Sequence, residues 1–189
     1  PVLLHEVLQW LSPKPGGVFV DGTLGGGGHS EAILEAGAAV YGIDRDADAI
    51  AAASKRLSRF ARFFAVQGNF HDMRALLAPL GVAQADGVLL DLGVSSHQLD
   101  TAARGFSYHM DAPLDMRMDP TQGPTAADVL NDYAAPDLAR ILSTYGEERF
   151  ARSIAKAVVR ERETQPFTTS AQLVELLKRV VPAASQRSG

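Results

Sequence analysis

Residues 18–30 read VFVDGTLGGGGHS. The apolar run Val18, Phe19, Val20 predicts a buried strand, and the four consecutive glycines predict a tight turn. A helix over residues 31–36, ended by Gly37, follows the turn. Glycine suits such a turn because it lacks a Cβ, so the backbone can adopt a positive φ and a ligand can approach it closely. A strand, a glycine-rich turn and a helix in this order favour a Rossmann-like α/β fold.

The same alternation continues to residue 92. Asp46 can cap a second helix, because it directly precedes a stretch that has apolar residues on one helical face. Strands separated by helical segments predict a parallel sheet with right-handed crossovers. The further strands are expected over residues 39–43, 62–66 and 86–92, and the further helices over 47–60 and 71–77.

After Gly93 the pattern changes. Residues 94–124 show neither helical nor strand periodicity, and a segment of that length indicates a functional loop. Thr125 and Asp128 form a predicted capping box at the start of an all-helical region. That region has helices expected over residues 126–133, 136–145, 147–163 and 169–181. No strand is expected after residue 92, so the sheet is predicted to be incomplete and the chain to be a fragment.

The expected organisation has three parts. Residues 1–100 form a cofactor-binding domain with four strands, residues 101–124 a connecting functional loop, and residues 125–189 a helical substrate-recognition domain. Net charge is −6 over residues 1–129 and +2 over residues 130–189, so an anionic partner is expected at the C-terminal third.

Composition excludes several classes of site. The chain has no cysteine, which excludes disulfides and thiolate metal sites and fits a cytoplasmic protein. No apolar run reaches the ~18 residues of a membrane span, so no membrane partner is expected. The histidines lack metal-ligand spacing, and no metal site is predicted. They are His5, His29, His71, His97 and His109.

Asp44 lies nineteen positions after Gly25, at the end of the second expected strand. A carboxylate there can accept both ribose hydroxyls of an adenosine-containing cofactor, whether NAD, FAD or S-adenosylmethionine. Asp21 lies at the mouth of the turn, where it would repel a pyrophosphate but favour the cationic S-adenosylmethionine. The alternatives are a dinucleotide-dependent oxidoreductase, or a turn in which Asp21 only caps backbone amides.

Further residues follow strands at the same edge. Phe70 comes after the third strand, where its ring can stack on adenine, although a phenylalanine in this position is more often part of the core. Asp91 follows the fourth strand. His29 stands at the helix start after the turn. Because carboxyl ends of parallel strands share one edge, four residues are expected to converge on one crevice, namely Asp21, Asp44, Phe70 and Asp91.

A basic stripe is predicted in the C-terminal third. Its four members are spaced to share one face of the helix expected over residues 147–163, and they are Arg149, Arg152, Lys156 and Arg160. Such a stripe can hold a phosphate backbone. The alternative is a solvated face whose cations pair with acidic neighbours, namely Glu147, Glu148, Glu161 and Glu163.

Several motifs resemble one known family. Residues 91–96 (DLGVSS) are followed by Gln98, Leu99 and Asp100, and residues 113–119 read PLDMRMD. The segments 1–4 (PVLL), 21–23 (DGT), 104–107 (RGFS) and 145–150 (YGEERF) agree as well. Together they resemble the bacterial 16S rRNA (cytosine-N(4)) methyltransferases, the RsmH or MraW family, over essentially the whole chain. His97 departs from the pattern, in which proline is common.

The resemblance implies a function and a set of site residues. The implied reaction transfers a methyl group from S-adenosylmethionine to the N(4) amine of a cytidine in 16S rRNA near the decoding centre of the small subunit. The implied cofactor contacts are Gly27, Gly28, His29, Asp44, Phe70, Asp91 and Gln98. The candidate acceptor for a proton of the reacting amine is Asp91 or the backbone carbonyls just after it. In the family the helical domain is an insertion into the sheet domain. The alternative is a catalytically silent RNA-binding or ribosome-assembly factor with the same fold.

Overall fold

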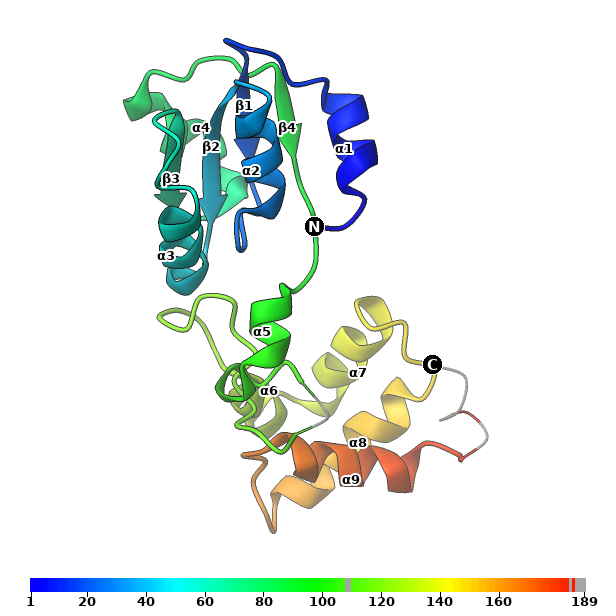
Figure 1. The fold of residues 1–189 in the computed structure, drawn as a ribbon. Coiled ribbons are helices and arrows are strands. Elements are labelled where there is room, and N and C mark those ends of the chain that lie inside the picture. The colour runs from blue at the N-terminus through cyan, green and yellow to red at the C-terminus, as the bar shows by residue number, and fades with distance from the viewer. Residues whose placement is uncertain (108–109, 184, 186–189) are drawn as a thin grey trace. The chain divides into compact units, whose positions relative to one another are not determined.

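The computed structural model describes residues 1–107, 110–183 and 185, without the side chains of Ser96 and His97. The chain divides into two compact units, Pro1–Ser95 and Ser96–Gly189, whose elements are labelled in Figure 1. Each unit has its own hydrophobic core. None of the helices in the described ranges is long and apolar enough to cross a membrane.

The first unit contains a parallel sheet of four strands in the order β3-β2-β1-β4. The strands are β1 (Val18–Asp21), β2 (Ala39–Asp44), β3 (Phe63–Gln67) and β4 (Gly87–Leu89). Asp21 at the end of β1 is in register with Gly42 of β2 and Leu89 of β4. The predicted parallel α/β sheet is therefore confirmed, and β1 lies between β2 and β4.

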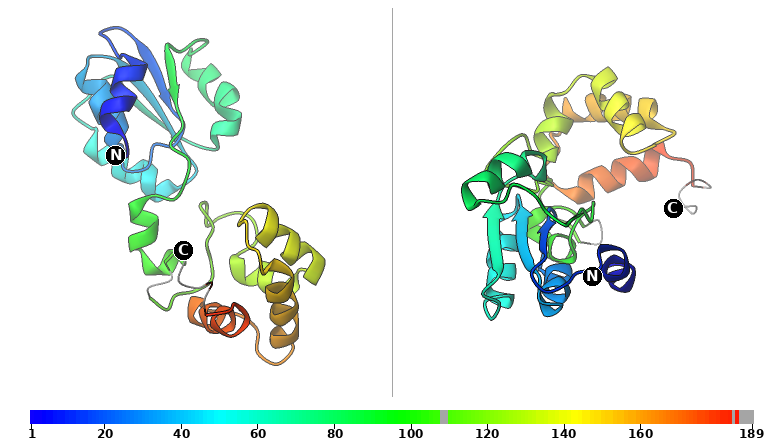
Figure 2. Two further views of the ribbon diagram at one scale, coloured as in Figure 1. Left: turned by 90° about the vertical axis from the view of Figure 1, so that its right-hand side faces the viewer. Right: turned by 90° about the horizontal axis from the view of Figure 1, so that it is seen from above.

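Helices cover both faces of this sheet. Alternate residues of β1 point to opposite faces, so Phe19 belongs to one hydrophobic cluster and Val20 to another. The first cluster lies under α1 (Leu4–Leu11), α2 (Gly28–Glu35) and the end of α3 (Ala47–Arg56). The second lies under α4 (Met73–Leu77), which is flanked by the short 3-10 helices η1 (Phe70–Asp72) and η2 (Ala78–Leu80). Figure 2 shows α1 and α4 on opposite sides of the strands.

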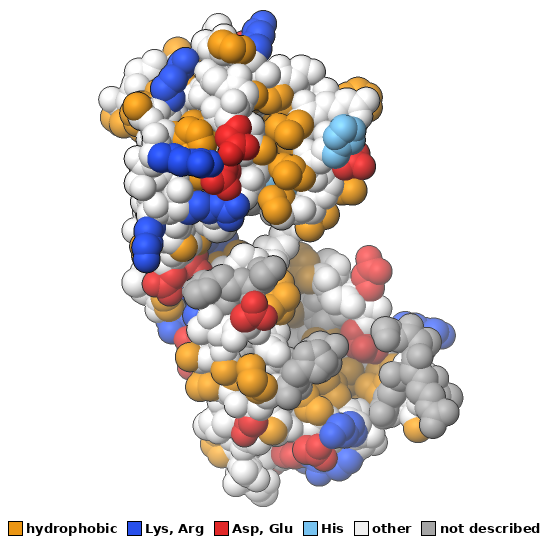
Figure 3. All heavy atoms as spheres, viewed as in Figure 1, with side chains coloured by type: hydrophobic (Ala, Val, Ile, Leu, Met, Phe, Trp, Pro, Cys, Tyr) orange, Lys and Arg blue, Asp and Glu red, His pale blue; other side chains and the backbone are white. Residues whose placement is uncertain are grey.

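β4 is one of the two edge strands of the described sheet, with β1 as its neighbour. It is shorter than the predicted strand over residues 86–92. After Leu89, which accepts a hydrogen bond from the Gly22 N–H, the chain turns toward the β1 turn, where the Asp91 N–H donates to Thr23 Oγ1. Val88, Leu90 and Leu92 are exposed, and Figure 3 shows hydrophobic side chains at the surface of this unit.

Helix boundaries in the first unit differ from the prediction at α2, α3 and α4, and α4 begins at Met73 instead of residue 71 because the 3-10 helix η1 precedes it. α2 begins at Gly28 instead of residue 31, because Gly27 adopts a left-handed conformation (φ 76°) and its carbonyl accepts the Glu31 N–H. α3 ends at Arg56 instead of residue 60, since a turn from Leu57 to Phe60 follows it. Asp46 caps α3 as predicted, by accepting the Asp48 N–H.

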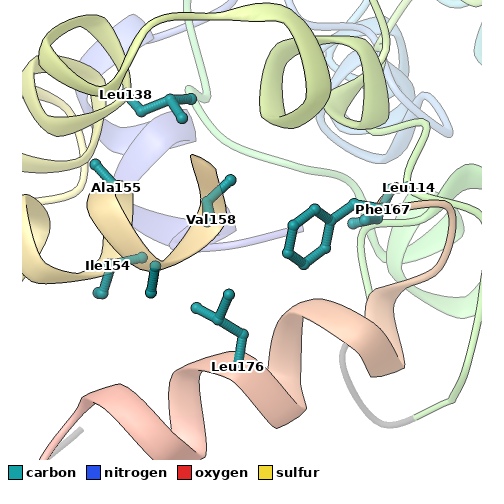
Figure 4. Close-up of a cluster of buried hydrophobic side chains, with 8 residues drawn as sticks. Leu114, Leu138, Ile154, Ala155, Val158, Phe167 and Leu176 are labelled. Atoms are coloured by element: carbon teal, nitrogen blue, oxygen red, sulfur yellow. The ribbon is translucent and has the colours of Figure 1, made fainter. Parts of the chain in front are cut away.

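The second unit is helical. Its main helices are α6 (Ala126–Asp132), α7 (Ala135–Thr144), α8 (Ala151–Arg162) and α9 (Ser170–Val180). Leu138 of α7, Val158 of α8 and Leu176 of α9 point toward one another, with Phe167 beside them (Figure 4). The predicted capping box of Thr125 and Asp128 is present. Apart from an isolated bridge between Pro113 and Thr169, the described part of this unit has no strand.

Segment 94–124 is more regular than predicted. It contains α5 (Ser96–Asp100) and the 3-10 helix η3 (Ala102–Arg104). Helices of one turn are too short to produce an apolar period, which is why the pattern showed none. The rest of the segment is organised by polar contacts, since Arg104 Nη2 donates to the carbonyls of Arg117 and Met118 at 3.0 and 2.8 Å.

α8 begins at Ala151, four residues later than predicted. Glu147 has a positive φ of 50°, which no residue inside an α-helix adopts. Glu148 then accepts the Phe150 N–H through Oε1 at 2.7 Å and stabilises the turn before the helix. As a result Arg149 is not a helical residue, and the predicted helix face loses its first member.

Candidate cofactor site

The turn after β1 has an open surface. Gly25 and Gly27 have φ of 49° and 76°, in the left-handed region that favours glycine. A Cβ at Gly27 would lie 3.0 Å from Leu57 Cδ1, so a side chain there would meet the core of the unit. A Cβ at Gly26, by contrast, would meet no atom within 4 Å. The turn therefore packs against the core at Gly27 and leaves free space beside the backbone of Gly26.

Asp44 joins the end of β2 to this turn. Its Oδ2 accepts the Gly25 N–H at 2.8 Å, and its Oδ1 accepts the Asp46 N–H at 3.0 Å. These two bonds hold the carboxylate in one orientation. A carboxylate has about four lone-pair positions, so Asp44 keeps acceptor capacity for hydroxyl groups of a ligand.

Asp21 lies beneath the turn and not at its mouth. Its side chain is 1% exposed and accepts hydrogen bonds from Ser30 Oγ at 2.7 Å and the Thr23 N–H at 3.2 Å. Burial raises the pKa of Asp21, and the bonds from Ser30 and Thr23 oppose that rise.

The prediction that Asp21 faces a ligand is therefore wrong. The alternative, in which it caps backbone amides, describes its contacts better. Because Asp21 is buried, its negative charge is also a weaker argument against a dinucleotide cofactor.

Asp91 and His29 lie beside each other at the end of β4. The Asp91 N–H donates to Thr23 Oγ1 at 2.7 Å, which fixes the backbone of Asp91 to the turn. Its side chain is 46% exposed, and Oδ2 lies 3.9 Å from His29 Nδ1. His29 Nε2 lies 2.8 Å from the Val2 carbonyl. Because a carbonyl only accepts, Nε2 carries the proton in that contact.

Phe70 is brought to the same edge of the sheet. It is the first residue of η1 and is half-buried. A Cβ at Gly22 would lie 3.0 Å from Phe70 Cβ, so the Cβ of Phe70 lies next to the turn. The Asn69 side chain caps η1 by accepting the His71 N–H at 3.0 Å.

The first unit thus gathers six of the seven predicted cofactor residues at one edge. These are Gly27, Gly28, His29, Asp44, Phe70 and Asp91. Gln98 is a buried residue of α5 in the second unit, and its role stays a prediction. Sequence reasoning missed Thr23 and Ser30. The only sequence signal for them is that both carry a hydroxyl close to the glycine turn. Thr23 Oγ1 accepts the Asp91 N–H, and Ser30 Oγ donates to Asp21.

The predicted basic stripe is only partly a helix face. Arg152, Lys156 and Arg160 are exposed residues of α8, whereas Arg149 precedes the helix. The predicted pairing with acidic neighbours is not found among the described residues. Glu161 instead binds Arg179 through both oxygens at 2.6 and 2.5 Å, and Glu148 accepts the Phe150 N–H.

Within the described residues, no group of three or more His, Asp or Glu side chains could hold a metal ion. His109 lies outside the described residues.

The sequence matches the model of the MraW methylase family over residues 1–189. It is 57% identical over 195 residues to a protein of Nocardioides sp. named Ribosomal RNA small subunit methyltransferase H, and this alignment covers 100% of the chain and 61% of that protein. A protein of the same name from Carboxydothermus hydrogenoformans is 53% identical over 189 residues, with 99% of the chain and 61% of that protein covered. The chain spans about three fifths of the length of these relatives.

Two solved structures match part of the chain. An rRNA methylase from Streptococcus thermophilus is 22% identical with a TM-score of 0.35, over 38% of this chain and 46% of that one. The C-terminal domain of precorrin-6Y C5,15-methyltransferase from Rhodobacter capsulatus is 26% identical with a TM-score of 0.41, over 50% of each chain.

Proposed function

The chain belongs to the MraW methylase family, and from this premise we propose that it is an S-adenosylmethionine-dependent methyltransferase of the small ribosomal subunit. Its substrate is the exocyclic N(4) amine of a cytidine in 16S rRNA, near the decoding centre, and it works in the cytoplasm. The observation that carries the proposal is the convergence of the glycine turn, Asp44, Phe70 and Asp91 at the carboxyl edge of one parallel sheet.

The residues of the turn fit S-adenosylmethionine. The space beside Gly26 admits a ligand against the backbone, and a side chain there would fill it. Asp44 has lone pairs for the two ribose hydroxyls, and the Phe70 ring offers an apolar surface for adenine. Gly27, Gly28 and His29 would line the methionine end. When bound, S-adenosylmethionine supplies an activated methyl group.

Asp91 is the residue that we assign to the reacting amine. The exocyclic amine of cytosine is a weak nucleophile because its lone pair is delocalised into the ring. A carboxylate that accepts an N–H of this amine favours a localised lone pair and stabilises the positive charge that develops on nitrogen. Asp91 is exposed, and its backbone is held by Thr23, so it can present an oxygen to the base and take up the released proton.

Two parts of the proposal concern the wider protein. We assign cofactor binding to the sheet-containing unit and substrate recognition to the helical one, with Gln98 as a cofactor contact contributed from α5. The target base has to be unstacked to reach a carboxylate at the sheet edge, so single-stranded or distorted RNA is the expected substrate.

Removal of the Asp44 carboxylate tests the cofactor site. Asp44→Ala should abolish S-adenosylmethionine binding in calorimetry, because it removes the ribose acceptor and frees the Gly25 N–H. Glu35→Ala is the matched control, since Glu35 is exposed and pairs only with Arg59 among the described residues. Normal cofactor binding by Asp44→Ala would refute this placement of the cofactor.

Asp91→Asn separates binding from chemistry. It keeps the shape of the side chain but removes its charge, so turnover should fall by about 10²-fold or more, with a smaller loss of cofactor affinity. Transfer of labelled methyl to naked 16S rRNA and to assembled small subunits identifies the substrate. Intact protein that binds RNA but methylates neither would instead be a silent assembly factor, and an NADH-dependent absorbance change would indicate an oxidoreductase.

A further inference from the structure

A groove lies between α7 and the start of α8 in the helical unit. Its volume is about 820 Å³, and it is lined by residues along α7, by the first two turns of α8 and by the residues that precede α8. The lining residues that carry the argument are Arg140, Arg149, Phe150, Arg152, Ser153 and Lys156. These residues define the α7–α8 groove. Arg160, the last member of the predicted stripe, does not line it.

The α7–α8 groove is strongly cationic. Four cations line it, Arg140, Arg149, Arg152 and Lys156, against one carboxylate, Glu148. Glu148 is turned to its own backbone, where it accepts the Phe150 N–H at 2.7 Å. Arg140 is 3.8 Å from Asp137, while Arg149, Arg152 and Lys156 form no ion pair with any described carboxylate. The positive charge is therefore not compensated within the described part of the unit.

A second cavity in the same unit does not share this excess of positive charge. It has a volume of about 370 Å³ and is lined by Glu161, Glu175, Gln172 and Arg179, among others. Its single arginine is held by both oxygens of Glu161. Two carboxylates against one paired cation make this cavity unsuitable for an anion, whereas the α7–α8 groove is open to one.

The chemistry of the groove favours phosphate groups in a chain. Arginine forks bind phosphate oxygens through two parallel hydrogen bonds, and the lysine adds a mobile point charge. The first turn of α8, where the positive end of the helix dipole lies, also lines the groove and includes Ser153. Lys156 lies one helical turn beyond Arg152, so the cations extend along the groove and are not gathered around one point.

We propose that the α7–α8 groove binds the phosphodiester backbone of the RNA substrate, at nucleotides other than the one that is methylated. This inference rests on the proposed function for the identity of the ligand. It adds Arg140 to the predicted RNA-binding residues and removes Arg160. The groove lies within the helical unit, and its cations bind phosphate groups and not the reacting amine, so it contributes to affinity and not to chemistry.

The test compares two double variants of the intact protein. Arg152→Gln with Lys156→Gln removes two charges from the groove, and Lys14→Gln with Arg74→Gln removes the same charge from exposed positions of the first unit. Binding of a single-stranded 16S rRNA fragment is measured by fluorescence anisotropy at a series of salt concentrations. The groove variant should lose about tenfold in affinity, and its slope of log K against log salt should shrink by about 1.4, at 0.7 per lost phosphate contact. The control should change neither value.

Arg160→Gln decides between the groove and the helix face. If the groove binds the backbone, this variant keeps the affinity and salt slope of the wild type, while Arg140→Gln weakens binding. A loss at Arg160 equal to that at Arg152, with no loss at Arg140, would overturn the groove in favour of the helix face. Circular dichroism of each variant checks that the helices are intact.

Methyl transfer separates this inference from the proposed function. In the groove variant, KM for RNA should rise while kcat at saturating RNA and the affinity for S-adenosylmethionine stay unchanged. If the wild type methylates RNA and the groove variant has an unchanged KM, the groove inference is wrong and the proposed function stands. If RNA binding depends on the groove but no methyl is transferred, the proposed function is wrong and the groove stands.

Discussion

The two units of the chain hold their charged residues in opposite ways. At the turn of the first unit, Asp21 and Asp44 are held by hydrogen bonds from neighbouring groups, and the backbone of Asp91 is bonded to Thr23. At the α7–α8 groove of the second, Arg149, Arg152 and Lys156 are exposed and form no ion pair with a described carboxylate. Preorganised groups suit a small ligand of defined shape, and loose cations suit a flexible polyanion, whose binding depends on charge more than on geometry.

The largest effect is expected from Gly27→Val. Valine would be forced into a left-handed conformation, and its Cβ would lie 3.0 Å from Leu57 Cδ1, so the variant should lose about 3 kcal/mol of stability. Chemical denaturation followed by fluorescence measures this loss, and cofactor binding should disappear with it. Gly26→Ala is the control for stability alone, because a Cβ there meets nothing within 4 Å and φ is not positive, although the methyl group would enter the space assigned to the ligand. Equal stability of the two variants would show that the turn is not preorganised.

The pH dependence of stability comes next and depends on Asp21. Burial raises the pKa of this carboxyl above its usual 3.8, so the folded state binds its proton more tightly than the unfolded state does. Its contribution to stability is therefore complete below pH 3.8 and is lost as the pH rises through the folded pKa. Asp21→Asn should remove this loss.

Denaturation from low to neutral pH, with wild type and variant compared, measures the Asp21 contribution alone. The comparison is needed because the pKa of Asp115 and of Asp128 is lowered by hydrogen bonds and charge, which gives the opposite pH dependence. Stability of Asp21→Asn relative to the wild type should increase as the pH rises. A constant difference between the two would contradict the assignment of Asp21 as a buried carboxyl.

The smallest effect is expected from Arg179→Gln in the second unit. Arg179 binds Glu161 through both carboxylate oxygens, but the two side chains are 61% and 32% exposed, so the pair contributes about 0.5 kcal/mol at most. Thermal denaturation should shift little, and RNA affinity should not fall. If Arg179→Gln lost as much RNA affinity as the groove variant, cations outside the α7–α8 groove would contribute equally to RNA binding. The contrast between the two cavities of this unit would then disappear.

Local sequence patterns predicted much of the fold. Apolar runs between helical segments are enough to indicate a parallel sheet, because strand and helix periods differ and are read over a few residues. The edge that gathers Asp44, Phe70 and Asp91 follows from the same pattern, since parallel strands all end at one side. The capping box of Thr125 and Asp128 was predictable because its two bonds join residues three positions apart.

Other features depend on contacts that the local pattern does not contain. The predicted start of α8 at residue 147 was wrong. The apolar period extends back to that residue, but the positive φ of Glu147 and the hydrogen bond from the Phe150 N–H to Glu148 prevent a helix there. Arg140 was missed as a groove residue because it lies on a different helix, and only packing of α7 against α8 brings it near Lys156.

The turn after β1 shows the division most clearly. The succession of a strand, a glycine turn and a helix can be predicted from the residues alone, because glycine and apolar patterns act over short distances. The burial of Asp21 beneath the turn, and the hydrogen bonds that join Asp44 and Asp91 to the turn after β2 and β4, appear only in the folded chain. Asp21 ends β1, which lies between β2 and β4, so its burial depends on how the strands are ordered in the sheet. The same order brings Asp44 and the Asp91 backbone to partners that are far away in the sequence.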